Sequence, residues 1–232
     1  MKSKLPTQKS SKRDIDQFLG EVKNRLPARA NGTTGRILFA IDATASRQPT
    51  WDTACHLQSH MFRAASNLGG LAISVCFFRG FDEFRASSWH TSAAELQRKM
   101  SAVRCMGGQT QIARTLRHAE KETRKRRIQA VVFIGDACEE TAGPLYSLAG
   151  KLALLNTPVF VFQEGRDQRV AKIFETIAQR SGGAYCQLDE NSAEFLTELL
   201  SAVAVYASGG RQALLKLSRG KPRLAQLSQQ VK

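Results

Sequence analysis

The sequence is poor in acidic residues, in aromatic residues and in long hydrophobic runs. Asp and Glu number 20 against 34 Lys and Arg, and aromatic side chains make up 7% of the 232 residues. No stretch approaches the roughly 18 consecutive apolar residues that a membrane-spanning helix needs, and the N-terminal residues lack the apolar segment of a signal peptide. We therefore expect a cytoplasmic protein that does not insert into a membrane.

Cysteine pairs and nucleotide-binding motifs are also missing. The five cysteines are widely spaced and never occur as C-x-x-C, which argues against a disulfide framework or a zinc ribbon. Neither G-x-G-x-x-G nor G-K-[ST] occurs, so binding of dinucleotides or of nucleotides through a P-loop is poorly supported. With 42% hydrophobic and 23% charged residues, the chain can nevertheless bury a sizeable core.

The positive charge is concentrated at the two ends of the chain. Of the formal net charge of +14, residues 1–35 carry +5 and residues 207–232 carry +6. These values predict a basic N-terminal arm at residues 1–35, a folded domain at residues 36–206 and a basic C-terminal tail at residues 207–232. Such tails bind nucleic acid or other anionic surfaces, or only keep a protein in solution, and the sequence leaves both roles open.

Short apolar runs alternate with segments of helical periodicity across residues 36–206. Runs that are apolar on both faces predict buried parallel strands, and a run that is polar at alternate positions after a turn predicts an antiparallel edge strand. The predicted strands are residues 37–41, 71–78, 84–89, 130–134, 159–162 and 184–188, and the predicted helices are residues 51–68, 110–126, 142–155, 168–179 and 192–206. We therefore predict an α/β fold with a doubly wound, mostly parallel six-stranded sheet, one antiparallel edge strand and helices on both faces.

Oxygen-bearing side chains follow three of these predicted elements. Asp42, Thr44 and Ser46 come after the first strand, Thr110 opens a helix after two glycines, and Asp136 follows the fourth strand. Because parallel strands end at one edge of a sheet, we expect these five side chains to lie together. Two carboxylates and three hydroxyls suit Mg²⁺ or Mn²⁺ and do not suit zinc. The alternative, that Asp42 and Asp136 only cap helices, is compatible with metal binding.

The pattern resembles the von Willebrand factor A (VWA) family. The resemblance covers about residues 36–206 and rests on D-x-[ST]-x-S after the first strand, a threonine in a glycine-rich loop and an aspartate after a later apolar strand. It implies a metal-ion-dependent adhesion site (MIDAS) in which Mg²⁺ or Mn²⁺ is held by Asp42, Thr44, Ser46, Thr110 and Asp136. Thr44 stands where the family usually has serine, and its hydroxyl preserves the ligand.

The resemblance also implies a function, that of a non-enzymatic module that binds a protein partner. In the family, a carboxylate of the partner often completes the metal shell, and intracellular members often act as adaptors in larger assemblies such as AAA+ ATPases. Gln109, Glu139 and Glu140 flank the predicted site and are candidates for contact with the partner. The two glutamates fit the solvated start of a helix equally well.

Two other functions remain open at this point. A dehalogenase-like phosphatase would use the aspartate after the first strand, but it needs a second acid two residues later, where this chain has Thr44. Nucleic-acid binding by the basic tails is the other possibility, and the scarcity of aromatic residues weakens it for single strands. The basic cluster at residues 121–127 fits either the dipole at the end of a helix or the docking of an anionic partner.

Overall fold

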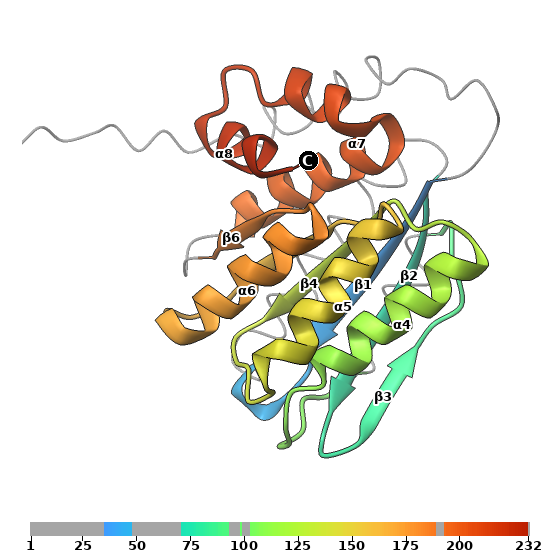
Figure 1. Cartoon of the computed structure of the whole chain (residues 1–232), viewed down its shortest axis with the longest axis vertical. Helices are drawn as coiled ribbons and strands as arrows, with labels where there is room; N and C mark the ends of the chain where they lie inside the picture. The colour runs from blue at the N-terminus through green and yellow to red at the C-terminus, as the bar shows by residue number, and fades with distance from the viewer. Residues whose placement is uncertain (1–34, 48–70, 93–97, 99–102, 189–192, 232) are drawn as a thin grey trace, which may run out of the picture.

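A computed structural model describes residues 35–47, 71–92, 98, 103–188 and 193–231 (Figure 1). The predicted N-terminal arm, except for Gly35, and the predicted helix at residues 51–68 lie outside the described residues. In the described part of the chain, no helix is long and apolar enough to cross a membrane.

The centre of the structure is a six-stranded sheet with the order β3-β2-β1-β4-β5-β6. Every neighbouring pair is parallel except β2 and β3, which form an antiparallel hairpin. The strands are β1 (Gly35–Asp42), β2 (Leu71–Arg79), β3 (Glu83–Ala86), β4 (Ala130–Gly135), β5 (Val159–Gln163) and β6 (Tyr185–Gln187). The predicted mostly parallel sheet with one antiparallel edge strand is confirmed.

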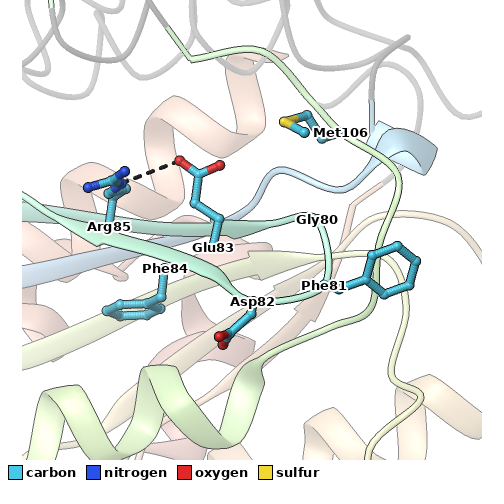
Figure 2. Close-up of a pocket in the computed structure, with 7 residues that line it drawn as sticks. All are labelled: Gly80, Phe81, Asp82, Glu83, Phe84, Arg85 and Met106. Carbon is cyan, nitrogen blue, oxygen red and sulfur yellow. Dashed lines mark hydrogen bonds and ion pairs between the residues drawn. The ribbon is translucent and has the colours of Figure 1, made fainter.

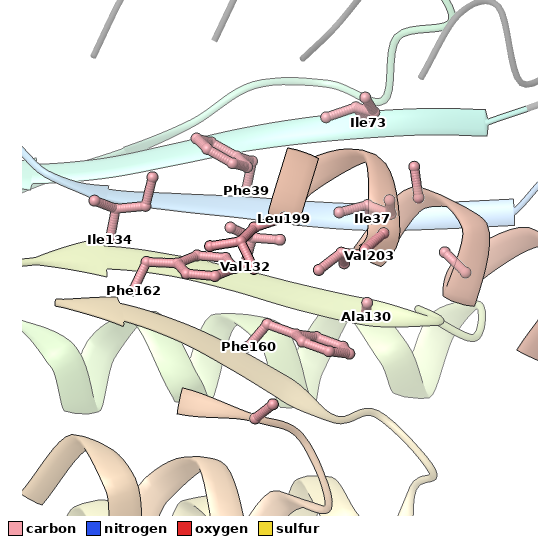
Figure 3. Packing of buried hydrophobic residues seen from close by; sticks show 14 of the residues in the cluster. Ile37, Phe39, Ile73, Ala130, Val132, Ile134, Phe160, Phe162, Leu199 and Val203 are labelled. Carbon is pink, nitrogen blue, oxygen red and sulfur yellow. The ribbon is translucent and has the colours of Figure 1, made fainter. Parts of the chain in front are cut away.

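Helices cover both faces of the sheet, as predicted (Figure 1). One face packs against α4 (Ile112–Lys125), α5 (Ala142–Leu154) and α6 (Gln168–Ser181), and the other against α7 (Ala193–Leu217) and α8 (Pro222–Gln230). Alternate residues of each central strand pack into the two hydrophobic cores, one on each face of the sheet. In β1, Ile37 and Phe39 face α7 (Figure 3), whereas Leu38 and Ala40 face the other layer. This explains why the sequence of the strand is apolar throughout.

The C-terminal segment belongs to the fold. The sequence predicts a domain boundary after residue 206, but α7 runs through this position and α8 follows it. The basic side chains of Arg211 and Lys216 are exposed, whereas apolar residues of the same segment are buried in the core that α7 shares with the sheet: Leu214, Leu224, Leu227 and Val231. Residues 207–231 therefore pack on the domain and do not form a solvated tail, because their basic composition conceals an apolar helical face.

Candidate metal site

The carboxyl end of β1 gathers three of the predicted metal ligands. The backbone N–H of Thr44 donates to Oδ1 of Asp42 at 2.8 Å, which turns the chain into a single 3-10 turn, η1 (Ala45–Arg47). The hydroxyl oxygens of Thr44 and Ser46 then lie 3.1 Å apart. Asp42 and Thr44 are buried and Ser46 is exposed, so the group opens from the sheet toward solvent.

The carboxyl end of β4 places Asp136 beside this group. Residues Ile41 and Ile134 are paired across β1 and β4, and a Cβ built on Gly135 would lie 3.6 Å from Cβ of Asp42. Asp136 follows directly, and within the described residues its buried Oδ1 has no hydrogen-bond partner. A buried polar atom without a partner costs about 1–3 kcal/mol, and a cation bound here would offset this cost.

The loop that carries Thr110 is fixed between β1 and the β2–β3 hairpin. The backbone N–H of Met106 donates to the carbonyl oxygen of Ala43 at 3.1 Å, and that of Gln109 donates to the carbonyl oxygen of Gly80 at 3.2 Å. Gly108 lies so close to the hairpin that an added Cβ would be 1.9 Å from the same oxygen. Only glycine fits at this position, which explains one of the two glycines that precede Thr110.

Thr110 is bonded to the loop that follows β4. Its hydroxyl accepts a hydrogen bond from the backbone N–H of Glu139 at 3.2 Å, and its own N–H donates to Oε2 of Glu139 at 3.0 Å. Burial by itself would raise the pKa of the Glu139 carboxyl, but the hydrogen bonds from Thr110 and from the Glu139 backbone, together with the charge of Arg169, lower the pKa. This reciprocal pair links the third predicted ligand loop to the loop of Asp136.

Glu140 serves the start of α4. Its carboxylate accepts hydrogen bonds from the backbone N–H of Ile112 and, at 3.0 Å, from that of Ala113. Gln111, at the N-cap position, makes no side-chain cap, so Glu140 replaces the local capping residue. Burial raises the pKa of the half-buried Glu140 carboxyl despite these bonds. The sequence analysis missed this cap because the carboxylate comes from a position 28 residues away along the chain.

The structure thus brings three ligand loops to one edge of the sheet, with five oxygen-bearing side chains at or beside it. Throughout the described ranges, no three His, Cys, Asp or Glu side chains form a group that could hold a metal ion. A metal at this edge therefore needs the hydroxyl oxygens as well as the two carboxylates. This donor set fits a small hard cation and offers no nitrogen or sulfur ligand.

An open hollow of roughly 500 Å³ borders this edge (Figure 2). It is lined by the β2–β3 hairpin, residues 80–85, and by Met106, which is bridged to Thr44. Phe81 at the hairpin turn is 81% exposed and Met106 is 48% exposed. The hairpin forms ion pairs within itself and with α4. Arg79 pairs with Glu83 within it at 2.8 Å, and Arg114 of α4 pairs with Asp82 at 2.7 Å. The sequence analysis did not identify this apolar surface, since its two parts are far apart in sequence.

Solved structures share this architecture. A von Willebrand factor type A protein from Catenulispora acidiphila is 18% identical, with a TM-score of 0.61 over 76% of this chain and 43% of that one. Proximal thread matrix protein 1 from the mussel byssus, with zinc in its MIDAS motif, is 14% identical, with a TM-score of 0.60 over 74% of this chain and 46% of that one. The pilus adhesin SpaC from Lactobacillus rhamnosus GG, in an open conformation, is 10% identical, with a TM-score of 0.59 over 76% of this chain and 30% of that one.

The matched region is therefore less than half the length of each of these three proteins. No family model matches the sequence, and no curated protein matches it significantly. Identities of this size carry information on the fold alone. Together with the sheet order and the helices on both faces, they show that the described part of the chain has the von Willebrand factor A fold.

Proposed function

We propose that this chain is a protein-interaction module whose partner binds through a divalent cation, Mg²⁺ or Mn²⁺. The observation that carries the proposal is the convergence of three loops that bear oxygen ligands at the carboxyl edge of the sheet. The proposed ligands are Asp42, Thr44, Ser46, Thr110 and Asp136.

The residues at this edge fit such a cation. The hydroxyls of Thr44 and Ser46 are adjacent, and the buried Oδ1 of Asp136 has no hydrogen-bond partner among the described residues. When bound, the cation would supply a positive centre that attracts an anionic group. The zinc in the MIDAS motif of the mussel protein supports a divalent ion at this place in the fold, and the all-oxygen donor set favours Mg²⁺ or Mn²⁺ here.

The partner group that best fits is a carboxylate. Five protein ligands leave room in an octahedral shell, and an acidic side chain of the partner would fill the remaining position. Phe81 and Met106 would add apolar contact beside it, and the exposed side chains of Gln109 and Glu139 would lie at its rim. As the resemblance implies, the role would be that of an intracellular adaptor in a larger assembly such as an AAA+ ATPase.

We also propose that the module is not an enzyme. The residue two positions after Asp42 is Thr44, so the general acid that a phosphatase of this type needs is not supplied at that position. Purified protein with Mg²⁺ should therefore not hydrolyse p-nitrophenyl phosphate. If the wild type hydrolyses this substrate and Asp42→Ala does not, the chain is instead a phosphate-ester hydrolase.

Metal titration of the full-length protein tests the proposal. Mg²⁺ or Mn²⁺ at about 100 times its Kd should raise the free energy of unfolding by about 2.7 kcal/mol, and Asp136→Ala should abolish this gain and the calorimetric binding signal. Glu175→Ala is the matched control, because this exposed carboxylate lies on α6, outside the three ligand loops. Binding that is absent in the wild type, or equal in Asp136→Ala and the control, would refute the proposed metal site.

A further inference from the structure

The end of α4 and the turn after it form a cationic surface, which we call the basic turn. All of its basic side chains are exposed: Lys121, Arg124, Lys125, Arg126 and Arg127. The two neighbouring acids lie deeper. The side chains of Glu120 and Glu122 are 18% and 14% exposed, and they pair with Arg124 at 2.9 Å and with Lys125 at 2.6 Å. The layer that faces solvent is therefore positive.

The basic turn is held in a fixed conformation by Arg36. The guanidinium carbon of Arg36 lies 3.5 Å from the centre of the Trp89 ring, and its Nη1 donates to the carbonyl oxygen of Arg126 at 2.6 Å. Nε1 of Trp89 donates to Glu122 at 3.1 Å, which ties the same helix end from the other side. Burial lowers the pKa of Arg36, and the charge of Arg126 lowers it further. Arg36 and Arg126 are thus close enough to repel, and Glu122, 3.7 Å from Nη2 of Arg36, offsets part of this repulsion.

The basic turn lies at the start of β1, because α4 ends where this strand begins (Figure 1). Arg36 is the second residue of β1 and contacts Arg126, which is 90 positions further along the chain. The candidate metal site lies at the other end of β1. A ligand on the basic turn would leave that site accessible.

We propose that the basic turn binds the phosphate backbone of double-stranded nucleic acid without reading its sequence. Three of its five cations are arginines, whose planar guanidinium matches phosphate oxygens. Between residues 120 and 129 the one apolar side chain, Ile128, is buried, so the basic turn itself presents polar and charged groups to solvent. Polar, strongly positive surfaces are typical of nucleic-acid interfaces. This binding does not depend on the proposed metal site.

Fluorescence anisotropy of the full-length protein with a labelled DNA duplex of about 25 base pairs, in EDTA, tests the proposal. The variant is Arg126→Glu with Arg127→Glu. The matched control is Arg166→Glu with Lys172→Glu, two exposed cations at and before α6 that undergo the same change of charge. The variant should lose at least about tenfold in affinity, and its slope of log K against log salt should fall by about 2. The control should change by less than about threefold.

Several results would overturn the proposal. These are no binding by the wild type, a salt-independent affinity between about 50 and 200 mM KCl, or equal losses in the variant and the control. Polyglutamate that competes as well as an unlabelled duplex of equal charge would identify an acidic protein as the partner and overturn the assignment to nucleic acid. If circular dichroism shows that the glutamate variant is unfolded, Arg126→Gln with Arg127→Gln replaces it. This variant should lose less affinity for the duplex, because it removes the two charges without reversing them.

Discussion

Replacing Glu140 with alanine should destabilise the start of α4. In the wild type, the Glu140 carboxylate accepts hydrogen bonds from the N–H groups of Ile112 and Ala113, and Gln111 supplies no side-chain cap. A side-chain cap at a helix start contributes about 0.5–2 kcal/mol, and a negative charge near the helix dipole adds about 0.3–1 kcal/mol. We therefore expect Glu140→Ala to lower the free energy of unfolding by about 1–3 kcal/mol, measured by urea denaturation with circular dichroism.

Two further variants make this test specific. Glu140→Gln keeps a carbonyl acceptor and loses the charge, so it should fall between the wild type and the alanine variant. Glu175→Ala removes an exposed carboxylate in the middle of α6 and should change stability by less than about 0.5 kcal/mol. If Glu140→Ala lies within the same range as Glu175→Ala, the reasoning that a distant carboxylate caps α4 is refuted.

Three more outcomes are expected. Burial lowers the pKa of the His118 imidazole, so the unfolded chain binds a proton more readily than the folded chain does. The free energy of unfolding should therefore fall as the pH drops below about 6.5, and in His118→Leu the urea midpoint should depend less on pH. Gln230 bonds both the N–H and the C=O of Tyr185 on edge strand β6, so Gln230→Ala should increase self-association in light scattering, whereas unchanged scattering would contradict this. Gly108→Ala should lower the melting temperature, because its Cβ has no space, whereas Gly107→Ala, with open space, should not.

The sequence predicted the main elements of the sheet and the loops of the candidate site. Runs that are apolar on both faces, such as residues 37–41, are a local signal for a strand between two helix layers. The ends of parallel strands share one edge, which is a rule of topology that needs no coordinates. The position of Asp42 and Asp136 after such runs therefore predicts that they lie together. The structure places Cβ of Asp42 next to Gly135, the residue before Asp136.

What only the tertiary structure decided depends on contacts between distant segments. The cap that Glu140 gives to α4 and the Arg36 contact with the end of the same helix join residues 27 and 90 positions apart. The hollow between Phe81 and Met106 is lined by two separate loops, so no local pattern records any of these features. The packing of residues 207–231 is a similar case. Composition predicted a basic tail for this segment. The free energy gained by burying one apolar helical face against the sheet holds the segment on the domain, and its basic side chains remain exposed on the other face.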